Sequence, residues 1–161
     1  MTTKSDYTEA EWATLLRAPI VAGMAISIAD PGGPIETTHE VMATLRAVTA
    51  PGSDAELVRS VSGEVAATAK EHDNPVGDFK PKGTMAAQQV LDEVRAANEI
   101  LTAKAAPDEA AAFRDWLMAV AQAAADSAKE GGFMGFHAER VSAGEKEMLA
   151  RLAVAAGLET S

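Results

Sequence analysis

Four residues in one short segment have the types and the spacing of a metal site. Glu36 and His39 lie three residues apart. On a helix this spacing places both side chains on one face, as in bundles that bind metal through Glu-x-x-His. Asp30 and Glu40 flank the pair, and such oxygen and nitrogen donors suit a hard or borderline divalent ion. The alternative is an exposed polar helix start whose acidic side chains complement the helix dipole.

A two-metal carboxylate centre is not expected. It requires a second Glu-x-x-His, but the residues three positions before His72 and His137 are Ala69 and Met134. The chain also has no cysteine, which excludes thiolate metal sites and thiol nucleophiles. We therefore expect no cofactor, with a single divalent metal ion as the alternative.

A glycine-rich stretch, residues 131–137, contains the second group of candidates. Phe133, Met134 and Phe136 stand among glycines there, and His137 follows them. In one interpretation these side chains fold back and fill a core that small residues leave underpacked. In the other, Phe133, Met134, Phe136 and His137 form an apolar edge that binds a protein partner or a small ligand.

The sequence does not indicate a catalytic site. His137 could act as a general base, but no Ser or Asp partner is in register with it. Nucleophile-elbow and phosphate-loop patterns are also absent from the sequence. We therefore predict a protein without enzymatic activity.

The alanine content indicates the fold class. The 161-residue chain contains 35 alanines, and alanine is the strongest helix former. Apolar residues recur three and four positions apart instead of alternating with polar ones. We predict an all-α fold, a single domain over residues 1–161 that forms a compact bundle of about six helices.

Capping residues, prolines and glycines mark the expected helix ends. Capping boxes are predicted at Thr8, Ser53 and Ser142, each followed three residues later by a glutamate. The expected helices cover about 9–29, a segment from Pro34 to before Pro51, about 54–71, about 84–104, a segment from Pro107, and a segment from Ser142 to Gly157. The first is expected to kink at Pro19. Residues 1–7 are expected to be a disordered tail, and 72–83 and 131–141 to be long loops.

The charge balance excludes several classes of partner. The chain has 14 Lys and Arg residues against 24 Asp and Glu residues, a formal net charge of −10. This balance argues against nucleic acid and against anionic membranes as partners. The most apolar stretch, 18–29, is too short to span a bilayer, and Asp6, Glu9 and Glu11 are unlike the start of a signal peptide. We expect a cytoplasmic protein.

Two strings resemble the loop-and-acidic-helix segments of the TerB-like helical domains of bacterial tellurite resistance. One is Ala29-Asp30-Pro31-Gly32-Gly33-Pro34-Ile35 with Glu36 and Glu40 after it. The other is Val141-Ser142 with Glu145 and the Leu149/Leu152 pair. The resemblance covers about the first 50 and last 35 residues, and it implies an all-helical domain that binds divalent metal through Asp30, Glu36 and Glu40. This sequence departs from the family pattern in that Pro31 separates Asp30 from the glycines and no second aspartate loop lies near Val141.

These observations favour a non-enzymatic binding or interaction module, with a divalent-metal-binding TerB-like domain as the alternative. Trp12 and Trp116 are expected to be buried anchors whose indole N–H groups need acceptors. Small residues are expected to let two helices approach their neighbours closely, namely Ala18, Ala22, Gly23, Ala25, Ser27 and Ala29 in the first and 119–128 in the fifth. The alternative role of these small faces is self-association into a homodimer.

Overall fold

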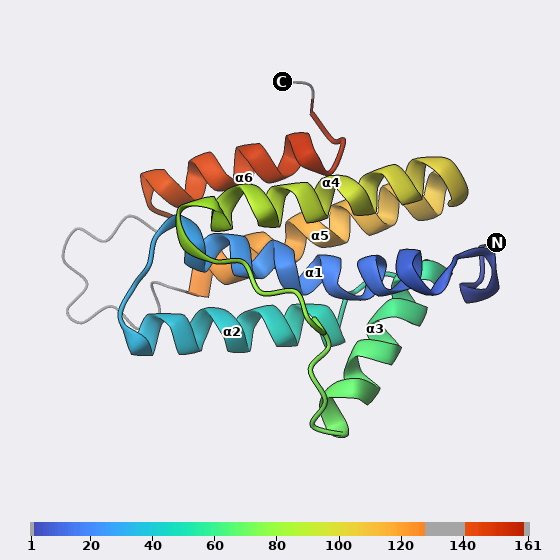
Figure 1. Ribbon diagram of the computed structural model, residues 1–161, viewed down its shortest axis with the longest axis horizontal. Helices are drawn as coiled ribbons and strands as arrows, with labels where there is room; N and C mark the ends of the chain where they lie inside the picture. The colour runs from blue at the N-terminus through green and yellow to red at the C-terminus, as the bar shows by residue number, and fades with distance from the viewer. Residues whose placement is uncertain (1, 128–140, 160–161) are drawn as a thin grey trace.

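A bundle of helices is the architecture of the chain. The computed structural model describes residues 2–127 and 141–159. Its elements are η1 (Lys4–Asp6), α1 (Glu9–Ala29), α2 (Pro34–Thr49), α3 (Glu56–Lys70), η2 (Gly83–Met85), α4 (Ala86–Lys104), α5 (Pro107–Ser127) and α6 (Ala143–Ala155). The described residues contain no strand, so the predicted all-α bundle is confirmed (Figure 1).

Helix α1 lies at the centre and packs against the other five α-helices (Figure 1). It is apolar because it is surrounded: Leu15, Val21 and Ile26 have no exposed surface. Within the described residues α1 is the one helix long and apolar enough to cross a membrane, and 56% of that apolar window is buried inside the fold. This burial is typical of a core helix. The helix continues through Pro19, and the predicted kink there stays a prediction.

Trp116 of α5 connects this helix to α2 through a hydrogen bond. Its indole Nε1–H donates to the main-chain oxygen of Ala47 on α2 at 3.2 Å. Its ring meets Phe113 edge-on, with centroids 5.3 Å apart. The other indole, Trp12, donates to Glu64 Oε2 on α3 at 3.0 Å. The expectation that both tryptophans are buried anchors with acceptors is confirmed.

Two of the three predicted capping boxes are present. Thr8 and Ser142 cap α1 and α6 as expected. The box predicted at Ser53 is wrong, because α3 begins at Glu56 with Ala55 before it. The Ser53 hydroxyl instead accepts from the Ala55 N–H at 3.3 Å, which closes a turn ahead of the helix.

The expected disordered tail is also wrong for the residues that the structure describes there. Thr2 is buried, its N–H donates to Glu109 Oε2 at 2.9 Å, and its hydroxyl accepts from the Ala106 N–H at 3.1 Å. Thr2 therefore satisfies polar groups at the start of α5, where the first amides of a helix lack partners. This contact fixes the chain ahead of α1.

The small-residue faces pack inside the fold. Ala18, Ala22 and Ala25 of α1 are buried, as are Ala121 and Ala124 of α5. Their expected role in close packing is confirmed, and this burial removes them as a self-association face.

Candidate ligand-binding groove between α1 and α2

The close approach of α1 and α2 depends on Gly23. A Cβ atom at Gly23 would lie 2.3 Å from Thr44 Oγ1 and 2.4 Å from Thr44 Cγ2. Non-bonded contacts of a Cβ atom are essentially never this short. The absence of a side chain at Gly23 is therefore what lets Thr44 lie directly against α1. The prediction that Gly23 permits a close helix contact is confirmed.

A groove of about 320 Å³ lies along this contact. Its lining residues come only from the two helices, and they are Ile20, Gly23, Met24 and Ser27 of α1 with Thr37, Val41, Thr44 and Leu45 of α2. The walls are aliphatic apart from three hydroxyl groups, and none of the lining side chains is charged. Small-molecule sites have this character: apolar walls, a few polar groups that fix orientation, and a volume of roughly 300 to 1,000 Å³.

Replacing Gly23 with alanine is expected to lower the free energy of unfolding by up to about 2 kcal/mol. Overpacking against Thr44 costs about 1–3 kcal/mol, and the higher helix propensity of alanine returns about 1 kcal/mol. Urea denaturation measures the change. Because the clash is with the Thr44 side chain, the double variant G23A/T44A should recover part of the loss, whereas additive effects of the two substitutions would contradict the contact.

A buried carboxyl group lies next to Ser27, one of the residues that line the groove. Glu40 of α2 is 2% exposed, and its Oε2 accepts a hydrogen bond from the Ser27 hydroxyl of α1. None of the ion pairs formed by the described residues includes Glu40. The Ser27 hydroxyl donates its hydrogen to Glu40, so its oxygen, on a residue that lines the groove, retains the capacity to accept a hydrogen bond.

The surroundings of Glu40 disfavour its ionised form. Burial raises the pKa of Glu40, and the negative charges of Glu145, Glu36 and Asp30 raise it further, while the Ser27 hydrogen bond opposes them. Glu145 is equally buried, and its carboxylate accepts from the Ser142 N–H at 2.7 Å in the capping box of α6. The junction of α1, α2 and α6 therefore brings several acidic groups together, and no residue that the structure describes forms an ion pair with Glu40.

The predicted metal ligands have separate local partners. Asp30 is exposed at the end of α1, and Glu36 Oε2 accepts from the Gly33 N–H at 2.7 Å, capping α2. His39 is half-buried, and its Nδ1 has no hydrogen-bond partner among the described residues. Across residues 2–127 and 141–159, no three His, Asp or Glu side chains form a group that could hold a metal ion. The structure therefore does not bring Asp30, Glu36, His39 and Glu40 together as one ligand set.

The second predicted group lies outside the described residues. Phe133, Met134, Phe136 and His137 all belong to 128–140. Their predicted role in binding a partner or ligand stays a prediction. Phe79, in the other long loop, packs against the core, where its aromatic ring adds volume among small residues.

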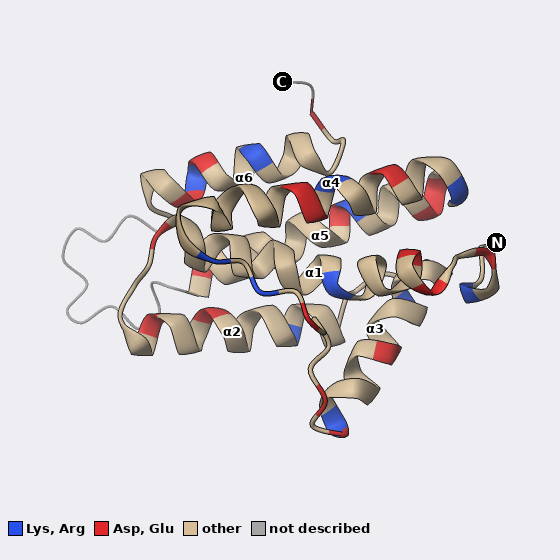
Figure 2. Ribbon diagram, viewed as in Figure 1, with Lys and Arg blue, Asp and Glu red and all other residues tan. Residues whose placement is uncertain are grey.

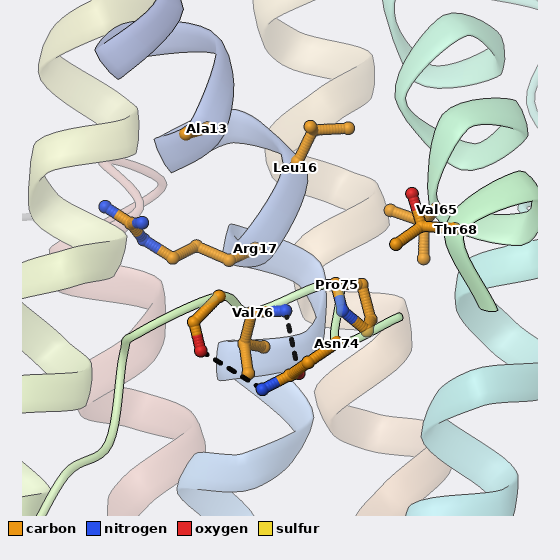
Figure 3. A pocket seen from close by; sticks show the side chains of 9 residues that line it. Ala13, Leu16, Arg17, Val65, Thr68, Asn74, Pro75 and Val76 are labelled. Atoms are coloured by element: carbon orange, nitrogen blue, oxygen red, sulfur yellow. Dashed lines mark hydrogen bonds between the residues drawn. The ribbon is translucent and has the colours of Figure 1, made fainter. Parts of the chain in front are cut away.

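A smaller cavity, about 190 Å³, lies where the segment after α3 crosses α1 (Figure 3). Its polar groups already have partners. Asn74 accepts from the Val76 N–H at 3.2 Å and donates to the Gly77 oxygen at 3.1 Å, and Arg17 pairs with Glu93 on α4. This cavity is therefore a less suitable ligand site than the α1–α2 groove.

The sequence did not predict the groove, although the spacing of some of its lining residues can be recognised in the sequence. On α2 the lining residues Thr37, Val41, Thr44 and Leu45 recur at spacings of three and four, and Gly23 marks the close approach on α1. The missing information was which helix faces which. Only the packed structure shows that α2, and not α5, lies over Gly23.

Comparison with known proteins gives no relative: no protein family, curated protein or solved structure matches the chain. The resemblance to TerB-like domains therefore stays an expectation from the residues alone.

Proposed function

We propose that the chain is a non-enzymatic binding module, and that its ligand site is the groove between α1 and α2. The ligand class is a small neutral molecule with an apolar body and one uncharged hydrogen-bond donor such as a hydroxyl group. The observation that carries this proposal is the groove itself, with its volume of about 320 Å³ and its uncharged lining.

The polar features of the groove support the ligand class. An anionic ligand would find no cationic side chain among the residues that line the groove. A donor on the ligand could instead bond to the lone pairs of the Ser27 oxygen. The apolar body would cover Met24, Val41 and Leu45, removing their surface from water.

The experiment uses 1-naphthol, a neutral two-ring molecule with one hydroxyl, and isothermal titration calorimetry. The variant M24W places an indole in the groove and is expected to weaken binding at least tenfold. Its matched control is M118W, because Met118 is a half-buried methionine of α5 that does not line the groove. Equal affinities in M24W and M118W, or no binding by the wild-type chain, would contradict the proposal.

A second ligand tests the role of Ser27. We expect 1-methoxynaphthalene, which has no donor, to bind about 2- to 10-fold more weakly than 1-naphthol, the range that a net hydrogen bond of about 0.5–1.5 kcal/mol gives. This preference should disappear in S27A. A preference that persists in S27A would assign the donor contact to Thr37 or Thr44 instead.

The divalent-metal alternative has one feature in its favour, which is the mutual electrostatic influence of Glu40, Glu145, Glu36 and Asp30. Against it stands the lack of a three-residue ligand group in the described residues. Native mass spectrometry of protein prepared without chelator separates the two: a stoichiometric metal adduct that the variant E36A/H39A loses would favour metal binding.

A further inference from the structure

The ammonium group of Lys4 lies in a small site formed by α1 and α3. Lys4 belongs to η1, and its Nζ donates to Oε1 and Oε2 of Glu64 on α3 at 2.9 and 2.8 Å. The same Nζ lies over the Trp12 ring of α1, 5.5 Å from the ring centroid. The negative face of an indole ring attracts a cation, and a carboxylate is a strong acceptor for its N–H groups. Trp12 and Glu64 therefore bind an alkylammonium group, which in this structure belongs to the chain itself.

The site is held in place by contacts that do not involve Lys4. The Trp12 Nε1–H donates to Glu64 Oε2 at 3.0 Å, which fixes the carboxylate beside the ring. The Tyr7 ring packs against the Trp12 ring, with centroids 5.7 Å apart. The orientation of both binding groups is therefore set without the cation, and such preorganisation favours binding.

A cavity of about 340 Å³ adjoins this site, and its volume is similar to that of the α1–α2 groove. The residues that line it include the apolar Ala13 and Leu16, the aromatic Tyr7 and Trp12, and the acidic Glu9 and Glu64. The first turn of α1 is acidic (Figure 2), because it contains Glu9 and Glu11. A ligand that suits this cavity combines a cationic group with a short apolar body.

The Lys4 side chain is a weakly held occupant of the site. It is 60% exposed and the Glu64 side chain is 35% exposed, and ion pairs with this exposure contribute little to stability. The segment around Lys4 has other contacts, because the Thr3 N–H donates to Asp6 Oδ2 at 2.7 Å and Thr2 bonds to α5. The Lys4 side chain can therefore leave the site while the segment that carries it stays in place.

We propose that Trp12 and Glu64 form a second binding site, for a small primary alkylammonium ion that displaces the Lys4 side chain. A primary ammonium replaces the hydrogen bonds that Lys4 donates to Glu64, and its alkyl body lies in the adjoining cavity. The formal net charge of −10 favours the approach of a cation. Lys4 acts as a tethered competitor that lowers the apparent affinity for the free ion. The site shares no lining residue with the α1–α2 groove and does not depend on it.

Titration with n-butylammonium tests the site, because this ion has the four-carbon chain and the ammonium group of a lysine side chain. The chain contains two tryptophans, so two-dimensional NMR spectra of isotope-labelled protein contain two indole N–H resonances. The Trp12 resonance is expected to shift saturably, whereas the resonance of Trp116, whose N–H donates to Ala47, should not change. K4A removes the competitor and should bind the ion at least tenfold more tightly than the wild type.

The matched control is K70A, because Lys70 is an exposed lysine on the same helix as Glu64 and does not line the cavity. It changes the net charge as K4A does, so a general electrostatic effect would act on both variants. Equal affinities of K4A and K70A, or a Trp12 resonance that does not respond in K4A, would overturn the proposal.

Two further measurements test the role of charge. In K4A/E64Q the glutamine keeps an acceptor for the Trp12 indole but loses the negative charge, so n-butylammonium should bind at least tenfold more weakly than to K4A. 1-Butanol, which has the same chain length and no charge, should also bind K4A at least tenfold more weakly. Equal affinity of K4A for the two ligands, or an unchanged affinity in a K4A/E64Q variant that is folded by circular dichroism, would overturn the ammonium site.

Discussion

Replacing Trp116 with alanine is expected to lower the free energy of unfolding by about 3–5 kcal/mol, the usual cost of removing a buried tryptophan. The side chain is 3% exposed, packs edge-on against Phe113 and donates to Ala47. Its loss leaves a cavity at the contact between α5 and α2. Because α2 forms one wall of the groove, the affinity for 1-naphthol should fall as well.

Chemical denaturation in urea measures this effect, and W116F separates its two causes. Phenylalanine keeps most of the apolar volume but loses the indole donor, so its cost should be limited to about 1–2 kcal/mol. A change below about 1 kcal/mol in W116A would contradict the placement of Trp116 in the core.

The second large effect is expected at the Ser27–Glu40 pair. S27A should lower the free energy of unfolding by about 1–3 kcal/mol, because the buried Glu40 carboxyl group loses its hydrogen-bond partner on α1. The same substitution should raise the pKa of Glu40 further, since that hydrogen bond is the one contribution that lowers it. E40Q should act in the opposite direction at pH values above the folded-state pKa of Glu40, because glutamine cannot ionise and keeps an acceptor for Ser27.

The pH dependence follows from the direction of the pKa shift. Folding raises the pKa of Glu40 above its ordinary value of 4.5, so the folded protein binds this proton more tightly than the unfolded chain does. The stabilisation is complete below the unfolded pKa and is lost as the pH rises through the folded pKa. The advantage of E40Q over the wild type should therefore grow with pH through this window and vanish below it. Urea denaturation across the pH range, with E36Q as a control at a less buried neighbour, would contradict this account if the advantage of E40Q did not change with pH.

The helices were the part of this structure that local sequence could predict. The capping boxes at Thr8 and Ser142 and the prolines at Pro34 and Pro107 set helix starts through contacts within a few residues. Gly157 ends α6 with a positive φ of 79°, as expected of a C-terminal glycine. The error at the N-terminus arose because a distant residue decided the outcome: Thr2 is held by Glu109, more than a hundred positions away.

The candidate site could not be predicted for the same reason. Glu40 was expected to act with Glu36 and His39 because the three are close in sequence. In the structure its carboxyl group turns toward Ser27 on another helix, while Glu36 caps its own helix. Spacing along one helix predicts which residues share a face, but the neighbour of that face is set by tertiary packing.

The most direct test of the ligand groove is a titration of isotope-labelled protein with 1-naphthol, followed by the amide resonances in two-dimensional NMR spectra. Saturable shifts are expected, and they should be largest around Gly23, Ser27 and Thr44, where α1 and α2 meet. Saturable shifts centred on α4 and α6, or no saturable shift, would contradict the assignment of the α1–α2 groove as the ligand site.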